Sequence, residues 1–233
     1  MRNFIHKKKI ALGTGFCSIA CMMMLGACDT VFDVHPYDVR VKGDTDLNAK
    51  NIRKIEETVK SKDTIRFAVI SDSHQWLDDL QLAVNDINRR KDSIDFVIHC
   101  GDISDFSFIA GGVKFVCLNT NAIEYDYSRP VPNFDFMEAE RSRDSLSFNR
   151  TVVCMHAAPY SEQFNNNVAK VFNYYIHQFP QLQFCLDGHG HHTQTEDLYG
   201  DGTLFYMASS CHFHEYYLFT ITPKEYKYEV VKF

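Results

Sequence analysis

The sequence predicts an α/β domain in which helices and strands alternate before an antiparallel end. Residues 47–60 carry apolar residues at helical spacing, and residues 65–70 form a short apolar run typical of a buried strand. The same alternation then repeats, and after Gly202 the pattern changes to strands without helices. Because strands connected through a helix run parallel, we expect parallel pairing in the first part and antiparallel pairing at the end.

The expected elements follow the chain in order. Helices are predicted over residues 47–60, 77–87, 137–146 and 168–179. Buried strands are predicted over residues 65–70, 94–100, 151–155, 182–186, 204–208, 216–221 and 226–231, the last two forming a hairpin. A second hairpin is predicted over residues 107–118, because Gly111-Gly112 separates two apolar runs.

The first 46 residues predict export and membrane attachment. Residues 1–27 read as a signal peptide, because four basic residues without an acid precede an apolar stretch. The stretch ends in Leu25-Gly26-Ala27-Cys28, which resembles a bacterial lipobox, so Cys28 is the expected lipidation site and residues 28–46 the tether. A short uncleaved membrane anchor is the alternative. Both place a domain of residues 47–233 in the cell envelope, on the periplasmic side or at the outer membrane or cell surface.

Charge and cysteine content narrow the possible functions. Beyond residue 27 the chain has twenty basic residues, since four of the 24 precede that point, against thirty acidic ones. This surplus argues against nucleic-acid binding, which needs clustered Lys and Arg. The five cysteines beyond Cys28 fall mostly in apolar runs without a CxxC pair, so we expect them to pack as small hydrophobic residues.

Carboxylates and imidazoles follow the predicted strands directly. Four strand ends are involved, and the residues are Asp72, His74, Asp102, His156 and His189. The carboxyl ends of parallel strands form the crevice in which ligands bind. These side chains therefore predict a metal site at one edge of the domain.

The ordered motifs resemble those of the calcineurin-like metallophosphoesterases. They read Asp72-Ser73-His74, Gly101-Asp102-Ile103-Ser104-Asp105, His156 within CMHAAP, and Gly188-His189-Gly190-His191. The resemblance implies a four-layer αββα sandwich of two mostly mixed sheets, and hydrolysis of phosphomonoesters or phosphodiesters by a dinuclear centre. Small phosphorylated molecules are the implied substrates.

The resemblance also assigns roles to individual residues. Asp72, His74 and His191 resemble the ligands of one metal, Asp102 the bridging carboxylate, and His156 with His189 the ligands of the second metal. This mixture of oxygen and nitrogen ligands favours two divalent ions of Mn, Fe or Zn.

One motif of the family is missing. No Asn-His pair occurs in the sequence, so the GNH motif and its general-acid histidine are absent, and no catalytic acid is assigned. GDISDF runs directly into the predicted hairpin, which leaves no room for the dozen residues that a parallel crossover needs. We therefore predict that one internal α-β step is missing. Three outcomes are then possible: the sheet closes around the gap, another chain fills the gap, or the folded chain is poorly stable.

Several alternatives stay open at this point. The chain is an impaired hydrolase, an inactive membrane-tethered module that binds metal or ligand, or a non-functional remnant. His212 and His214 form either a third metal site or a satisfied polar pair, and we favour the pair. Asp105 orients a ligand or caps a turn, and His192 lies near the substrate or on an exposed loop.

Overall fold

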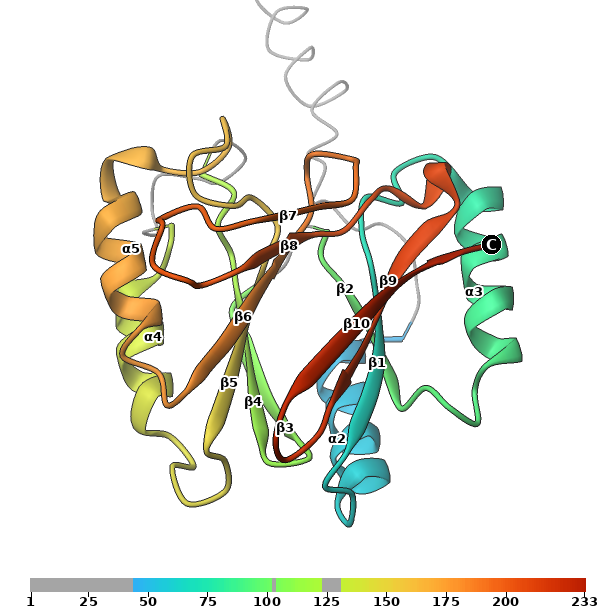
Figure 1. The fold of residues 1–233 in the computed structure, drawn as a ribbon, viewed down its shortest axis with the longest axis horizontal. Coiled ribbons are helices and arrows are strands. Elements are labelled where there is room, and N and C mark those ends of the chain that lie inside the picture. The colour runs from blue at the N-terminus through green and yellow to red at the C-terminus, as the bar shows by residue number, and fades with distance from the viewer. Residues whose placement is uncertain (1–43, 102–103, 123–130) are drawn as a thin grey trace, which may run out of the picture. The chain divides into compact units, whose positions relative to one another are not determined.

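The computed structural model of the chain describes residues 44–101, 104–122 and 131–233 and shows four layers (Figure 1). One outer layer holds α4 (Phe134–Ser142) and α5 (Ala169–Ile176), and the other holds α3 (Leu77–Arg89). Two β-sheets lie between them. The predicted αββα sandwich is confirmed.

The first sheet has four strands in the order β10-β9-β1-β2. Its members are β10 (Tyr226–Lys232), β9 (Glu215–Ile221), β1 (Ile65–Ile70) and β2 (Phe96–His99). β1 pairs parallel with β2 across α3 and antiparallel with β9, and β9 forms a hairpin with β10. The parallel β1-β2 pair and the β9-β10 hairpin were predicted, whereas the antiparallel pairing of β1 with β9 was not.

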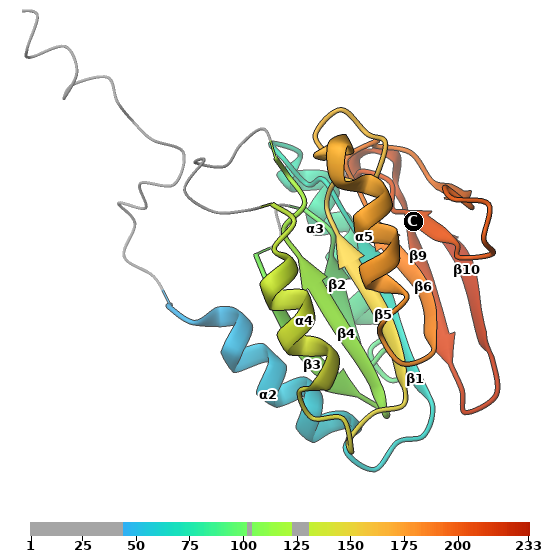
Figure 2. The same ribbon diagram turned by 90° about the vertical axis from the view of Figure 1, so that its left-hand side faces the viewer.

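The second sheet has six strands in the order β3-β4-β5-β6-β8-β7, and Figure 2 shows β3 to β6 side by side. Its members are β3 (Phe106–Ala110), β4 (Val113–Leu118), β5 (Arg150–Met155), β6 (Leu182–Asp187), β8 (Phe205–Met207) and β7 (Gln194–Glu196). The four central strands are parallel and both edge strands are antiparallel. The sequence pattern does not predict β7, because its three residues are polar and carry no apolar alternation.

Three apolar clusters hold these layers together. The largest lies between the sheets and includes Phe67, Phe115 and Phe219. The ring of Phe67 packs edge-on against Phe115 and stacks on Phe219. A second cluster joins the six-stranded sheet to α4 and α5, and a third joins the four-stranded sheet to α3. The described cysteines are buried, as predicted, and form no disulfide; Cys117, Cys154 and Cys185 lie at buried positions of β4, β5 and β6.

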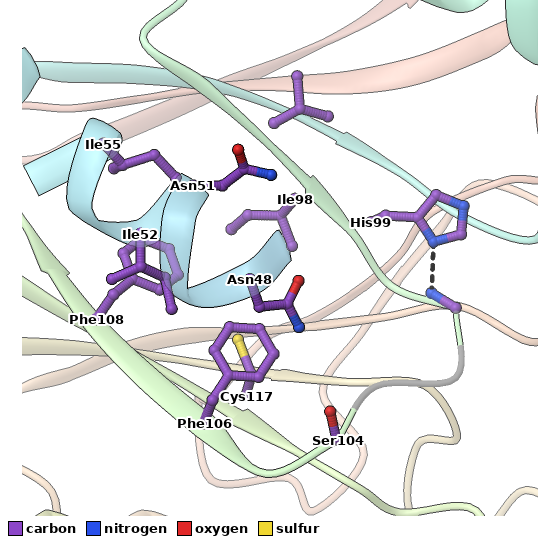
Figure 3. A pocket seen from close by; sticks show the side chains of 12 residues that line it. Asn48, Asn51, Ile52, Ile55, Ile98, His99, Ser104, Phe106, Phe108 and Cys117 are labelled. Carbon is purple, nitrogen blue, oxygen red and sulfur yellow. Dashed lines mark hydrogen bonds between the residues drawn. The ribbon is translucent and has the colours of Figure 1, made fainter. Parts of the chain in front are cut away.

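The place of the missing α-β step is a seam between the sheets. β2 ends the first sheet, and the β3-β4 hairpin starts the second, as the Gly111-Gly112 pattern predicted. α2 (Leu47–Val59) lies beside β3, and the backbone N–H of Ile109 donates to Glu56 Oε1 at 3.5 Å. A cavity of about 330 Å³ remains between α2, β2 and β3, lined by side chains such as Asn51, Ile98 and Phe108 (Figure 3). Among the described residues, no further strand pairs with the outer edge of β2 or of β3.

The compact unit that contains all these elements runs from Asp46 to Phe233. The predicted signal peptide, the Cys28 lipidation site and all but the last residues of the tether lie outside the described residues, and so does Asp102. Within the described ranges, no helix combines the length and the apolar character needed to cross a membrane.

Candidate metal centre

The loop after β1 and the loop after β6 meet at one end of the sandwich. The backbone N–H of His189 donates to Asp72 Oδ2 at 2.8 Å, and the Ser71 hydroxyl donates to the same oxygen at 2.6 Å. A Cβ on Gly188 would collide with the Ser71 hydroxyl and lie 3.0 Å from the carbonyl oxygen of Cys100. Glycine is therefore required here, because the backbone of Gly188 lies against the Ser71 side chain and leaves no space for a methyl group.

Asp72, His74 and His191 form a compact group, which we call the Asp72 cluster. One ligand atom from each lies within 4.8 Å of the other two. The Nε2 atoms of both histidines lie 3.4 Å from Asp72 Oδ1 and 3.1 Å from each other. Nitrogen and oxygen donors converge on one point, so these residues could hold a divalent cation.

The buried carboxylate of Asp72 fits that role. Its side chain is 1% exposed, and Oδ1 accepts no hydrogen bond from the described residues. A buried carboxylate oxygen without a partner is costly. Asp187 is also buried with an unsatisfied Oδ1, and burial, followed by the charges of Glu196 and Asp72, raises its pKa well above the usual carboxyl range. A cation bound between Asp72 and the two imidazoles would give Asp72 Oδ1 a partner.

The backbone of both ligand loops is strained in the same way. Asp72 and His74 have φ values of 46° and 39°, and His189 and His191 have values of 68° and 58°. Non-glycine residues rarely adopt this left-handed conformation, and such strain concentrates at functional sites. Each motif therefore has both of its predicted ligand residues in a left-handed backbone conformation.

His156 and His189 form the second part of the site, which we call the His156 pair. Their ring centroids lie 5.2 Å apart with the planes at 74°. His156 follows β5, is buried, and has Nδ1 2.9 Å from the carbonyl oxygen of Cys100. A cavity of about 540 Å³ is lined by residues of both parts, among them His74, His156, Glu162, His189 and His191.

The fold and the site geometry can be compared with known proteins. The model of the calcineurin-like phosphoesterase superfamily domain matches residues 65–211, well over half of the chain. The chain belongs to the calcineurin-like phosphoesterase superfamily. The predicted family is confirmed, and membership assigns the chain to the metal-dependent phosphoester hydrolases, whose substrates are phosphorylated molecules.

A solved structure of low sequence identity shares this fold, and a second one aligns more weakly. GAP50, the anchor in the inner membrane complex of Plasmodium, aligns with a TM-score of 0.53 at 8% identity, covering 72% of this chain and 84% of that chain. A dimetal phosphatase from Danio rerio aligns with a TM-score of 0.45 at 11% identity, covering 72% and 98%. No curated protein matches the sequence.

The structure brings together five of the six predicted ligands of this chain. These are Asp72, His74, His156, His189 and His191, which all lie at the cavity or on the loops beneath it. The sixth, Asp102, lies outside the described residues.

Four other polar residues that the sequence analysis considered form hydrogen bonds with neighbouring protein groups. His212 and His214 lie at a 3-10 turn rather than on one strand face, and both bond Asp79, at 2.9 and 3.0 Å. Asp105 accepts from the Asn119 N–H and the Asn133 amide, so it braces loops. His192 is exposed and bonds its own loop at Gly190 and Gln194.

Sequence reasoning missed four residues that brace or border the site. The hydroxyl of Ser210 donates to the Asp72 carbonyl oxygen at 2.9 Å, and that of Ser209 to the His191 carbonyl oxygen at 3.1 Å. Trp76 packs edge-on against His74 and His191. Ser209 and Ser210 follow β8, so the search for polar residues after strands could have found them. No pattern marks Trp76 or Glu162.

Proposed function

We propose that this chain is a lipid-anchored phosphoesterase of the cell envelope that hydrolyses phosphomonoesters or phosphodiesters with two divalent ions. The observation that supports it most is the Asp72 cluster, in which two imidazoles converge on a buried carboxylate oxygen without a hydrogen bond. The anchor and the location are inferred from the lipobox at Cys28 and the basic, then apolar, start of the sequence.

Individual residues have distinct parts in this proposal. Asp72, His74 and His191 would hold the first ion, His156 and His189 the second, and Asp102 would bridge the two. Such a pair of Mn, Fe or Zn ions supplies a nucleophilic water and neutralises charge on the phosphoryl oxygens. Ser209, Ser210 and the N–H of His189 keep the ligand loops in register, which limits reorganisation when substrate binds.

A second function is favoured by the absence of the GNH motif. Without its histidine, no residue of the sequence is assigned to protonate the leaving group. In that alternative the chain binds metal or ligand at the membrane and does not turn over substrate.

Asp102→Asn distinguishes the two functions. We expect it to abolish hydrolysis of a generic aryl phosphodiester by the full chain, because the neutral amide cannot bridge two cations. Hydrolysis that survives the substitution would contradict the bridging role. No turnover by the wild type, with metal retained, would establish the binding function instead.

A further inference from the structure

Glu162 lies outside every motif and contacts a proposed ligand of the second ion. Its Oε1 is 3.0 Å from His189 Nε2. An ionised carboxylate only accepts hydrogen bonds, so His189 must carry its proton on Nε2. The lone pair of His189 is then on Nδ1.

His156 has the opposite arrangement. Its Nδ1 is 2.9 Å from the carbonyl oxygen of Cys100, and a carbonyl oxygen also only accepts. The proton is therefore on Nδ1 and the lone pair on Nε2. The two rings of the His156 pair thus each have one nitrogen bonded to an acceptor and the other available to an ion.

The backbone around Glu162 is held on both sides. Asn166 accepts from the Tyr160 N–H at 2.8 Å and donates to the Ser161 carbonyl oxygen at 2.8 Å. On the other side, the Ala122 N–H donates to the Gln163 carbonyl oxygen at 2.8 Å. These bonds fix the loop that presents the carboxylate to His189.

The position of Glu162 argues against direct ligation. Among the described residues, the Asp72 cluster is the one group of three ligand atoms within 4.8 Å, and Glu162 is not part of it. Its side chain is 80% exposed and lies at Nε2, whereas the lone pair is on Nδ1. A carboxylate on the second nitrogen of a ligating imidazole fixes the tautomer and the ring orientation.

We propose that Glu162 is a positioning residue that holds His189 with Nδ1 available to the second metal ion. The inference rests on the proposed two-ion function. It gives the His156 pair a support that the family motifs do not provide, on the side of the site that the missing GNH motif leaves incomplete.

The test measures metal binding and tautomer separately. The full chain is purified in detergent as wild type, Glu162→Ala and Glu162→Gln, with His156→Ala as the reference for loss of the second ion. Glu138→Ala is the control, because Glu138 is also exposed and ion-paired, with Arg141. Mn²⁺ is titrated by calorimetry, and ring ¹⁵N shifts of the metal-free protein report the His189 tautomer.

We expect Glu162→Ala to weaken the second Mn²⁺ by about 10–100-fold and leave the first unchanged. The His189 ring should shift from one tautomer to a mixture, and Glu162→Gln, which keeps an acceptor, should restore part of the affinity. Unchanged binding of the second ion in Glu162→Ala, or equal weakening of both ions, would overturn the positioning role while the function stands. A wild type that binds fewer than two ions would overturn both.

Discussion

The two parts of the metal centre are held in different ways. The Asp72 cluster is supported from several sides: Ser71 and the His189 N–H bond the Asp72 carboxylate, and Ser209 and Ser210 bond the loop carbonyls. The ring nitrogens of the His156 pair contact one backbone carbonyl and one exposed glutamate, and the Gly188 N–H bonds the His156 carbonyl oxygen at 3.0 Å. Buried side-chain support is therefore denser around Asp72 than around the rings of the His156 pair.

This difference follows from the strands that carry each part. The Asp72 cluster is held by the segments that follow β1, β6 and β8. The second part needs the loop after β2, which the missing step would have followed. We therefore expect tight binding of the first ion and weaker binding of the second.

The largest expected effect comes from removing the charge at the centre of the Asp72 cluster. Asp72→Asn should weaken the tightest Mn²⁺ by more than about 100-fold, because outer partners of a ligand alone are worth about 10–100-fold. His156→Ala should instead remove only the weaker ion. Titration calorimetry on the full chain measures both, with Asp78→Asn as an exposed control on the same segment. Equal losses of Mn²⁺ affinity in Asp72→Asn and His156→Ala would contradict the proposed difference between the Asp72 cluster and the His156 pair.

A smaller effect is expected at the contact between the ligand loops. Gly188→Ala places a methyl group against Ser71, Asp72 and the Cys100 backbone, and such overpacking costs about 1–3 kcal/mol. Gly190→Ala is the matched variant, because its methyl group meets the flexible end of Met207. Thermal melts of the metal-free proteins should show a lower Tm for Gly188→Ala. Equal Tm values would show that the loops are not tightly apposed.

The smallest effect is expected beside the Asp72 cluster, at Asp79. Hydrogen bonds from His214 and then His212 hold the pKa of Asp79 below its ordinary value of 3.8. A carboxyl whose folded pKa is depressed stabilises the fold above its unfolded pKa, and the contribution is lost as pH falls through the folded pKa. The Tm difference between wild type and Asp79→Asn should therefore be present near pH 5 and shrink as the pH falls below 3.8. A difference that persists in acid would contradict this assignment.

Most of the fold and much of the candidate site could be predicted from the residues alone. Apolar runs and helical stripes located the α-helices and every strand except β7, because those elements bury apolar side chains at regular spacing. The Gly111-Gly112 hairpin and the shortage of residues after Asp102 placed the break in the α/β pattern. The rule that polar residues after parallel strands share one edge grouped Asp72, His74, His156 and His189, and the motif resemblance added His191.

The contacts that hold the predicted ligand residues in place could be seen only in the tertiary structure. Trp76, Ser209 and Glu162 act through contacts between segments distant in the chain, and no local pattern encodes such contacts. The same holds for α2, whose amphipathic pattern predicts a helix but not its place along β3 at the seam. Periodicity reports which face of an element is buried, whereas the partner of that face depends on how the layers pack.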